Sequence, residues 1–137
     1  MTPQEITLVQ RTFRHVLPIG DTAASLFYRR LFALDPSLRA MFPEDLRDQG
    51  RKLMQMMAVA VQGLSRFDDV VGAVEDLGRR HATYGVKPVH YDLVGEALLS
   101  TLAIALGDMF APDVRNAWAA AYRTLATTMQ RAAYQHA

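Results

Sequence analysis

The six prolines of this 137-residue chain mark breaks between segments that have the periodicity of an α-helix. They are Pro3, Pro18, Pro36, Pro43, Pro88 and Pro112. Proline lacks a backbone N–H and clashes with the preceding helical turn, so it belongs at helix starts and breaks. Between the prolines, apolar residues recur every three or four positions, and no segment shows the sustained alternation of a strand. The sequence therefore predicts an all-α fold of about seven helices, one of them very short.

Local signals place the ends of several of these helices. Thr2 and Glu5 have the spacing of a capping box, which predicts a helix that begins at once. Residues 41–50 are expected to form a loop, with a helix over about residues 49–64. A later helix is expected to end near Gly85, because glycine readily adopts the left-handed conformation that follows many helices.

Composition limits the class of the domain and its partners. Half of the residues are hydrophobic, which is enough for one compact core, so residues 1–137 are expected to form a single domain. Fifteen basic and 14 acidic residues leave a formal net charge of +1, which does not favour nucleic acid or an anionic membrane as a partner. The chain has no cysteine, which excludes disulfides, thiolate metal sites and cysteine nucleophiles.

The sequence shows no targeting signal. Its first residues lack a basic region followed by an apolar run, so no signal peptide is expected. No uninterrupted apolar stretch is long enough to span a bilayer. Together with the absence of cysteine, these features predict a cytoplasmic protein.

One histidine lies on an apolar helical stripe. Val70, Val74, Leu77 and His81 follow one another at spacings of four, three and four, which places them on one helix face. An imidazole on a core-facing stripe needs a polar partner, because an unpaired buried polar group is costly. A backbone carbonyl is the simplest partner, and a metal or haem iron is the other. The stripe alone leaves both interpretations open.

The order of these features resembles the globin fold, with an inward tyrosine on the second helix, Phe-Pro after the short helix and a lone histidine before a glycine turn. The resemblance is closest to the bacterial single-domain haemoglobins and the globin half of flavohaemoglobins, and it covers essentially the whole chain. The matching positions are residues 26–32, Pro36, 41–42, 52–53, His81, 85–86, 90–91, 94–99 and 117–122. Their order and spacing together carry the resemblance.

This resemblance implies a haem b cofactor with His81 as the proximal ligand of the iron. Phe42 then wedges the haem, and Tyr28 is the distal hydrogen-bond donor from the second helix. Gln49 and Leu53 face the ligand side, and their separation of four residues places both on one helix face. The alternative for Tyr28 is a core tyrosine bonded to a backbone carbonyl, and the alternative for Gln49 is a solvated residue at a helix start.

Six further residues are expected to surround the haem. Two of them, Lys52 and Arg80, are candidates to meet the haem propionates, because charge-assisted bonds to carboxylates are favourable at a pocket rim. Lys87 and His90 are further candidates for the same role. The alternative for Lys52, Arg80 and Lys87 is an ordinary solvated surface charge. The six residues are Lys52, Met57, Arg80, Val86, Tyr91 and Val94.

A haem with one protein ligand leaves a position open to dioxygen, nitric oxide or carbon monoxide. Tyr28 offers a hydroxyl donor and Gln49 an amide donor, which implies tight dioxygen binding with slow release. We therefore expect a protein that binds dioxygen reversibly. The alternative is nitric oxide dioxygenase, an enzyme that needs an external reductase here because the chain has no Gly-rich dinucleotide loop. A haem sensor and a haemless helical interaction protein are the remaining hypotheses.

The chain departs from the resembling family near the proximal histidine. In that family, a tyrosine at the position of Tyr91 joins a glutamate from the last helix. Counting from Trp118 places Ala133 at the glutamate position, and no acidic residue follows Asp113. We therefore expect His81 to be held by a backbone carbonyl and to be a weaker electron donor to iron.

Overall fold

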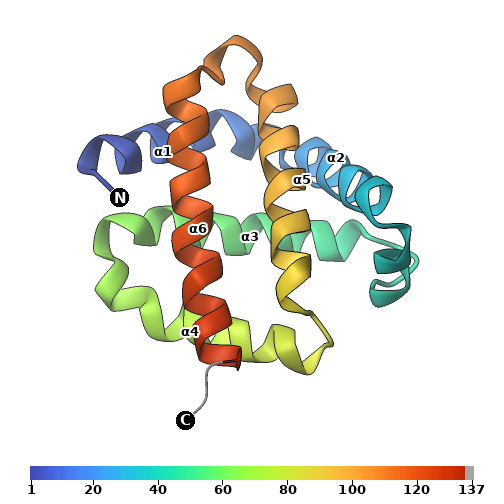
Figure 1. The fold of residues 1–137 in the computed structure, drawn as a ribbon. Coiled ribbons are helices and arrows are strands. Elements are labelled where there is room, and N and C mark those ends of the chain that lie inside the picture. The colour runs from blue at the N-terminus through green and yellow to red at the C-terminus, as the bar shows by residue number, and fades with distance from the viewer. Residues whose placement is uncertain (135–137) are drawn as a thin grey trace.

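Helices account for almost all of the structure, a computed structural model that describes residues 1–134 (Figure 1). The all-α fold predicted from the sequence is confirmed, although the described residues form six α-helices and four 3₁₀ helices instead of about seven helices, and the very short helix is the 3₁₀ helix η2. Within the described residues, the helices are α1 (Pro3–Val16), η1 (Leu17–Ile19), α2 (Gly20–Leu34), η2 (Pro36–Met41), α3 (Arg47–Gly63), η3 (Leu64–Arg66), α4 (Phe67–Thr83), α5 (Pro88–Leu106), η4 (Gly107–Met109) and α6 (Pro112–Tyr134).

Prolines and short polar side chains begin several of the helices. Pro3, Pro88 and Pro112 are the first residues of α1, α5 and α6, where a missing N–H leaves no helical bond unmade. The Thr2 hydroxyl accepts from the Glu5 N–H at 3.1 Å, and the Glu5 carboxylate accepts from the Thr2 N–H at 2.9 Å. These two bonds complete the predicted capping box of α1.

The loop before α3 is shorter than predicted. It comprises residues 42–46 rather than 41–50, and α3 begins at Arg47. The Asp45 carboxylate accepts from the Arg47 N–H at 3.0 Å, which satisfies one of the unpaired donors at the start of a helix. Gln49 therefore lies in the first turn of α3 instead of marking its beginning.

A tight turn ends α4 immediately after His81. The N–H of Val86 donates to the carbonyl of His81 at 3.0 Å, and the N–H of Gly85 donates to the carbonyl of Ala82 at 3.1 Å. These two bonds form a Schellman motif, in which Gly85 has the left-handed φ of 93° expected from the sequence. The turn thus fixes the backbone of His81 and directs the chain into α5.

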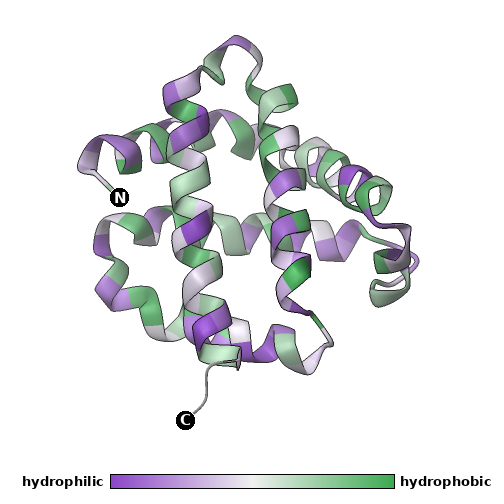
Figure 2. Cartoon of the chain, viewed as in Figure 1, coloured by the Kyte–Doolittle hydropathy of each residue, from purple (hydrophilic) through white to green (hydrophobic). Residues whose placement is uncertain are grey.

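Two groups of buried side chains form the core. One joins α1, α3, α5 and α6 and includes Phe13 and Trp118, and the other joins α2, η2 and α5 and includes Phe27 and Leu31. In Figure 2, hydrophobic and hydrophilic residues are interspersed along each helix, so each helix has an apolar side to bury. Helices α4 and α6 approach so closely at Gly78 that a Cβ atom there would overlap the backbone of α6.

Helix α5 is unusually apolar. By length and composition alone, residues 88–109 are long and apolar enough to cross a membrane, whereas the sequence has no uninterrupted apolar stretch of that length. In the fold, α5 contacts α2 and α6 and buries Tyr91, Ala97 and Leu102. About a third of its most apolar window is buried in this way.

Candidate functional site

A cavity of about 280 Å³ lies inside the fold, bordered by both groups of core side chains. Residues from α2, η2, α3, α4, α5 and α6 line the cavity, and most of them are aliphatic, aromatic or methionine side chains. Ten of the eleven residues expected around a haem are part of this lining: Tyr28, Phe42, Gln49, Lys52, Leu53, Met57, His81, Val86, Tyr91 and Val94. Distant parts of the sequence therefore meet at one apolar site.

Arg80 is the expected residue that lies outside the lining. It precedes His81 on α4, and successive residues of a helix point about 100° apart. The side chain of Arg80 is therefore exposed to solvent while His81 faces the cavity. Lys87 is also exposed and outside the lining.

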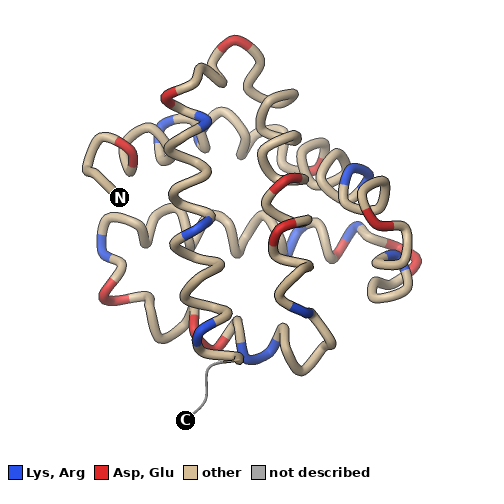
Figure 3. The backbone as a smooth tube through the Cα atoms, in the orientation of Figure 1, with Lys and Arg blue, Asp and Glu red and all other residues tan. Residues whose placement is uncertain are grey.

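The polar edge of the cavity is formed by Lys52 and His90. Charged residues occur along every α-helix (Figure 3), and among the described residues Lys52 is the one lysine or arginine in the lining. The Nδ1 atom of His90 accepts from the Lys87 N–H at 2.9 Å, so the proton of a neutral His90 is on Nε2. Both side chains can thus donate to an anionic group at this edge.

His81 faces the cavity with one ring nitrogen already engaged. Its Nδ1 lies 2.8 Å from the carbonyl oxygen of Leu77, one turn earlier in α4. A carbonyl only accepts hydrogen bonds, so in the neutral imidazole Nδ1 carries the proton and the lone pair of Nε2 is left available. The two interpretations of His81 are therefore compatible, because the carbonyl bond orients the imidazole for a metal at Nε2.

The residues of the cavity fit a haem better than a bare metal ion. Within residues 1–134, no three His, Asp, Glu or Cys side chains cluster as ligands for an ion. A haem supplies most ligands of its iron and takes an axial ligand from the protein. An apolar cavity with the Nε2 atom of His81 available meets that need.

Tyr28 and Gln49 meet at the cavity from α2 and α3. The Tyr28 hydroxyl lies 3.4 Å from the carbonyl oxygen of Gln49, which is long for a bond from an O–H donor. Burial raises the pKa of Tyr28 to about 12, and a hydrogen bond with the Gln49 side chain opposes the rise. The carbonyl partner considered for Tyr28 from the sequence is thus present, and the hydroxyl stays protonated at neutral pH.

Phe42 packs edge-to-face on two aromatic rings of α2. Its ring centre lies 5.5 Å from that of Tyr28 and 5.4 Å from that of Phe32. Tyr28 and Phe32 stack on each other with their ring centres 6.0 Å apart. These three mutual contacts, each favourable for aromatic rings, fix Phe42 and Tyr28 relative to one another.

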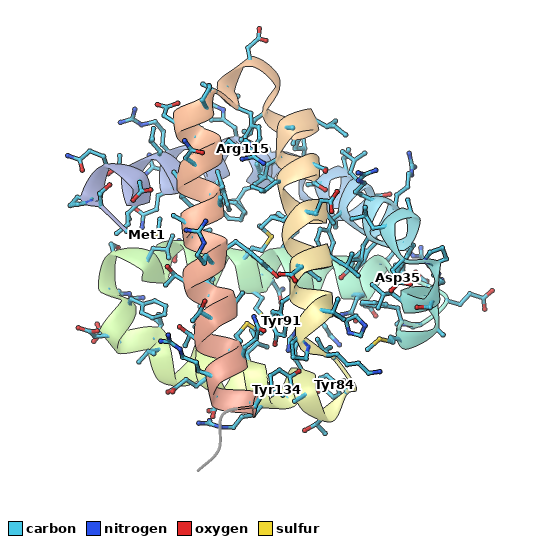
Figure 4. The ribbon with its side chains drawn as sticks, in the orientation of Figure 1. Met1, Asp35, Tyr84, Tyr91, Arg115 and Tyr134 are labelled. Atoms are coloured by element: carbon cyan, nitrogen blue, oxygen red, sulfur yellow. The ribbon has the colours of Figure 1, made fainter. Side chains whose placement is uncertain are left out.

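The hydroxyl of Tyr91 is buried and has no hydrogen-bond partner among the described residues. Figure 4 labels Tyr91 between α5 and α6, with Tyr134 nearer the end of α6. The Tyr122 hydroxyl donates to the Tyr91 carbonyl at 2.6 Å, and the Tyr134 hydroxyl donates to the carbonyl of Val86. Burial raises the pKa of Tyr91 to about 12, with a smaller contribution from Tyr134, so this phenol is also a neutral donor.

Sequence reasoning left a group of lining residues without a role in the site. Their three-and-four spacing on α5 and α6 marks them as core, but it does not say which core residues border a cavity. Which core residues border the cavity depends on how α6 crosses α4 and α5, and no local sequence pattern predicts that crossing. These residues are Leu98, Trp118, Ala121, Tyr122, Leu125, Ala126 and Met129.

Comparison with known proteins agrees with this geometry. A sequence profile of the globin family, described as Globin, matches residues 25–129. A flavohemoprotein of Deinococcus radiodurans is 31% identical over 132 residues, which cover 94% of this chain and 33% of that protein. Flavohemoproteins of Vibrio cholerae and Bacillus subtilis are 30% and 29% identical over 92% and 88% of the chain, and over 33% and 31% of their own lengths.

The chain thus spans about a third of the length of these curated relatives. The matched region contains Tyr28, Phe42 and His81, which line one cavity in the structure. The profile covers most of the chain, so the chain belongs to the globin family, which implies a haem cofactor.

Proposed function

We propose that this globin binds haem b through the Nε2 atom of His81 and holds dioxygen reversibly, with nitric oxide and carbon monoxide as further ligands. The observation that carries the proposal is the 2.8 Å bond from His81 Nδ1 to the Leu77 carbonyl. That bond leaves Nε2 as the free ligand atom of an imidazole that lines an apolar cavity. Membership of the globin family supports the cofactor.

A bound haem supplies iron with one open coordination position, and the residues of the cavity set how long a ligand stays. Dioxygen at such a position carries partial negative charge, so the neutral O–H of Tyr28 stabilises it. The long bond to the Gln49 carbonyl costs little to give up, and the Gln49 amide is a second donor. Each bond contributes about 1 kcal/mol, so the pair slows dioxygen release by about tenfold to a hundredfold.

The rest of the cavity supports these roles. Its apolar lining excludes water, and hydrogen bonds are stronger where water is excluded. Phe42 and Leu53 belong to this lining, and Phe42 packs directly on Tyr28. Lys52 and His90 stand at the polar edge, where they suit the carboxylates of a haem.

A second candidate function is nitric oxide dioxygenase, in which nitric oxide and dioxygen would combine to nitrate with one electron that a bound haem would supply. Similarity to flavohemoproteins supports this candidate, and a reductase is then needed to return the electron. The neutral carbonyl of Leu77 is the partner of the His81 imidazole, and such a partner gives weaker electron donation than a carboxylate does. We therefore place reversible dioxygen binding first.

The absorption spectrum of the purified, haem-supplemented protein tests the cofactor assignment. We expect a Soret band in the wild type and in His15→Asn, and its loss or large shift in His81→Ala. His15→Asn is the matched control, because His15 is an exposed histidine that does not line the cavity. A spectrum unaltered by His81→Ala overturns the proposal. Nitric oxide consumption with a surrogate reductase then separates the enzyme from the ligand binder.

A further inference from the structure

The loop between η2 and α3, residues 42–46, places Phe42 at the cavity with little regular structure of its own. A loop of this kind needs partners for its backbone carbonyl groups. Its first three carbonyls all accept hydrogen bonds from a single side chain, that of Arg39 on η2. The position of Phe42 therefore depends on a residue that does not line the cavity.

Arg39 reaches these carbonyls with two nitrogen atoms of its guanidinium. One donates to the carbonyls of Phe42 and Pro43 at 3.3 and 2.9 Å, and the other donates to that of Glu44 at 2.8 Å. The backbone closes the same turn, since the Phe42 N–H donates to the Arg39 carbonyl at 3.2 Å. A guanidinium is a planar fork with five donors, whereas the ammonium of lysine is a single point of charge.

The same guanidinium also contacts the aromatic rings beside the cavity. Its central carbon lies 5.4 Å from the centre of the Phe32 ring, within the range of a cation–π contact. Phe32 packs against both Phe42 and Tyr28, which pack against each other. Arg39 therefore holds Phe42 through its backbone and supports Tyr28 through the rings that surround it.

We propose that Arg39 is a positioning residue of the ligand pocket, which fixes Phe42 against the haem and, through Phe32 and Phe42, sets the place of the Tyr28 hydroxyl. This inference rests on the function proposed above. It assigns two separate consequences to one side chain. Haem retention depends on Arg39 through Phe42, and dioxygen release depends on Arg39 through Tyr28.

The test compares Arg39→Met and Arg39→Lys with Arg47→Met. Arg47 is a matched control, because it follows the same loop, is exposed and pairs with the neighbouring Asp45 at 2.7 Å. Transfer of ferric haem to an excess of another apoglobin measures haem retention, and stopped-flow mixing measures dioxygen release. We expect haem loss to be about tenfold faster in both Arg39 variants, since losing one charge-assisted bond accounts for that factor. Arg47→Met is expected to stay within about twofold of the wild type.

A double-mutant cycle with Tyr28→Phe separates positioning from a general weakening of the fold. Arg39→Met is expected to speed dioxygen release severalfold when Tyr28 is present. In the Tyr28→Phe background the same change is expected to speed release by less than about twofold, because the two residues act through one hydroxyl. Haem loss is expected to remain faster in both backgrounds. An equal effect on dioxygen release in the two backgrounds overturns the role of Arg39 toward Tyr28.

The failure of this inference is distinct from the failure of the proposed function. Normal haem binding in the wild type, with Arg39 variants indistinguishable from Arg47→Met, overturns the positioning role alone. A wild-type protein that takes up no haem overturns both. Circular dichroism of the haem-loaded variants shows whether they are folded. If Arg39→Met is not folded, Arg39→Lys, which keeps the charge, tests the positioning role.

Discussion

Tyr28 is the residue whose environment speaks most directly to dioxygen binding. Its hydroxyl is buried and protonated, and its 3.4 Å contact with the Gln49 carbonyl is long, so it is free to turn to a ligand. We expect Tyr28→Phe to speed dioxygen release by about tenfold, because one hydrogen bond in a dry cavity is lost. Stopped-flow displacement by carbon monoxide measures the rate. Tyr122→Phe is the control, since Tyr122 also lines the cavity but its hydroxyl is engaged in a short bond of 2.6 Å to the Tyr91 carbonyl. Equal rates in the two variants contradict the distal role.

The unpaired hydroxyl of Tyr91 leads to a prediction about stability. A buried hydroxyl without a partner carries a desolvation cost of about 1–3 kcal/mol, and phenylalanine of the same shape does not. Tyr91→Phe is therefore expected to raise the free energy of unfolding of the haem-free protein by about 1 kcal/mol. Urea denaturation measures this change. A loss of stability would show that the hydroxyl has a partner in solution.

Individual residues were predictable where a local pattern or a family motif fixes them. The helical stripe ending at His81 and the motifs around Tyr28 and Phe42 belong to this class, and all three residues line the cavity. The contacts of Arg39 and the isolation of the Tyr91 hydroxyl were not predictable. They depend on the path of a five-residue loop and on where α6 crosses α5, which involve residues far apart in the sequence.

The end of α4 is the element that holds His81, and its glycines offer a matched pair of substitutions. Gly85 has φ of 93°, so Gly85→Ala forces a side chain into the left-handed region at a cost of about 1–2 kcal/mol. Gly72 lies inside α4, whereas Gly85 lies in the turn after it, and Gly72 has open space around it, so Gly72→Ala is expected to stabilise by up to about 1 kcal/mol. Thermal unfolding measures both changes.

The same pair tests whether the turn matters for the cofactor. The Val86 N–H donates to the carbonyl of His81, so a strained turn shifts the backbone that presents the imidazole. We expect haem loss to be faster in Gly85→Ala and unchanged in Gly72→Ala. Identical haem retention in the two variants would mean that the bond to Leu77 alone orients His81.

Most helices were predictable because their ends carry local signals. Proline at the start of α5 and α6 and the capping box of α1 act within a few residues, so the sequence states them directly. The start of α3 was placed two residues too late. The Asp45 side chain accepts a hydrogen bond from the Arg47 N–H in the first turn of α3. In the sequence, residues 43–46 favour a loop conformation, and this preference outweighs the helix-start signal of Asp45.

At the scale of the whole molecule, periodicity and composition were enough to predict an all-α fold with an apolar interior. They were not enough to predict the pairing of helices. The close approach of α4 and α6 at Gly78, for example, needs a position without a side chain on one helix and exposed backbone on the other. The cavity follows from several such crossings together, which is why its residues became apparent in the fold and not in any one segment.

The buried tyrosines make a prediction for the molecule as a whole in alkaline solution. Burial raises the pKa of Tyr28 and Tyr91 to about 12 and raises that of Tyr122 as well, while unfolded tyrosine has a pKa of about 10. Below pH 10 both states keep these protons, so the tyrosines add no pH dependence. Between about pH 10 and 12 the unfolded chain binds fewer protons than the native protein, and the free energy of unfolding falls as pH rises.

The steepness of that fall identifies the groups responsible. Each buried tyrosine contributes a slope of about 1.4 kcal/mol per pH unit at most, so Tyr28→Phe is expected to make the decline shallower. Tyr84 is 70% exposed, and Tyr84→Phe is the matched control that is expected to leave the slope unchanged. Urea denaturation of the haem-free protein from pH 8 to about pH 12 provides the curve. A decline of equal steepness in Tyr28→Phe and Tyr84→Phe would contradict the assignment, because the protons retained by the folded protein would then lie on other groups.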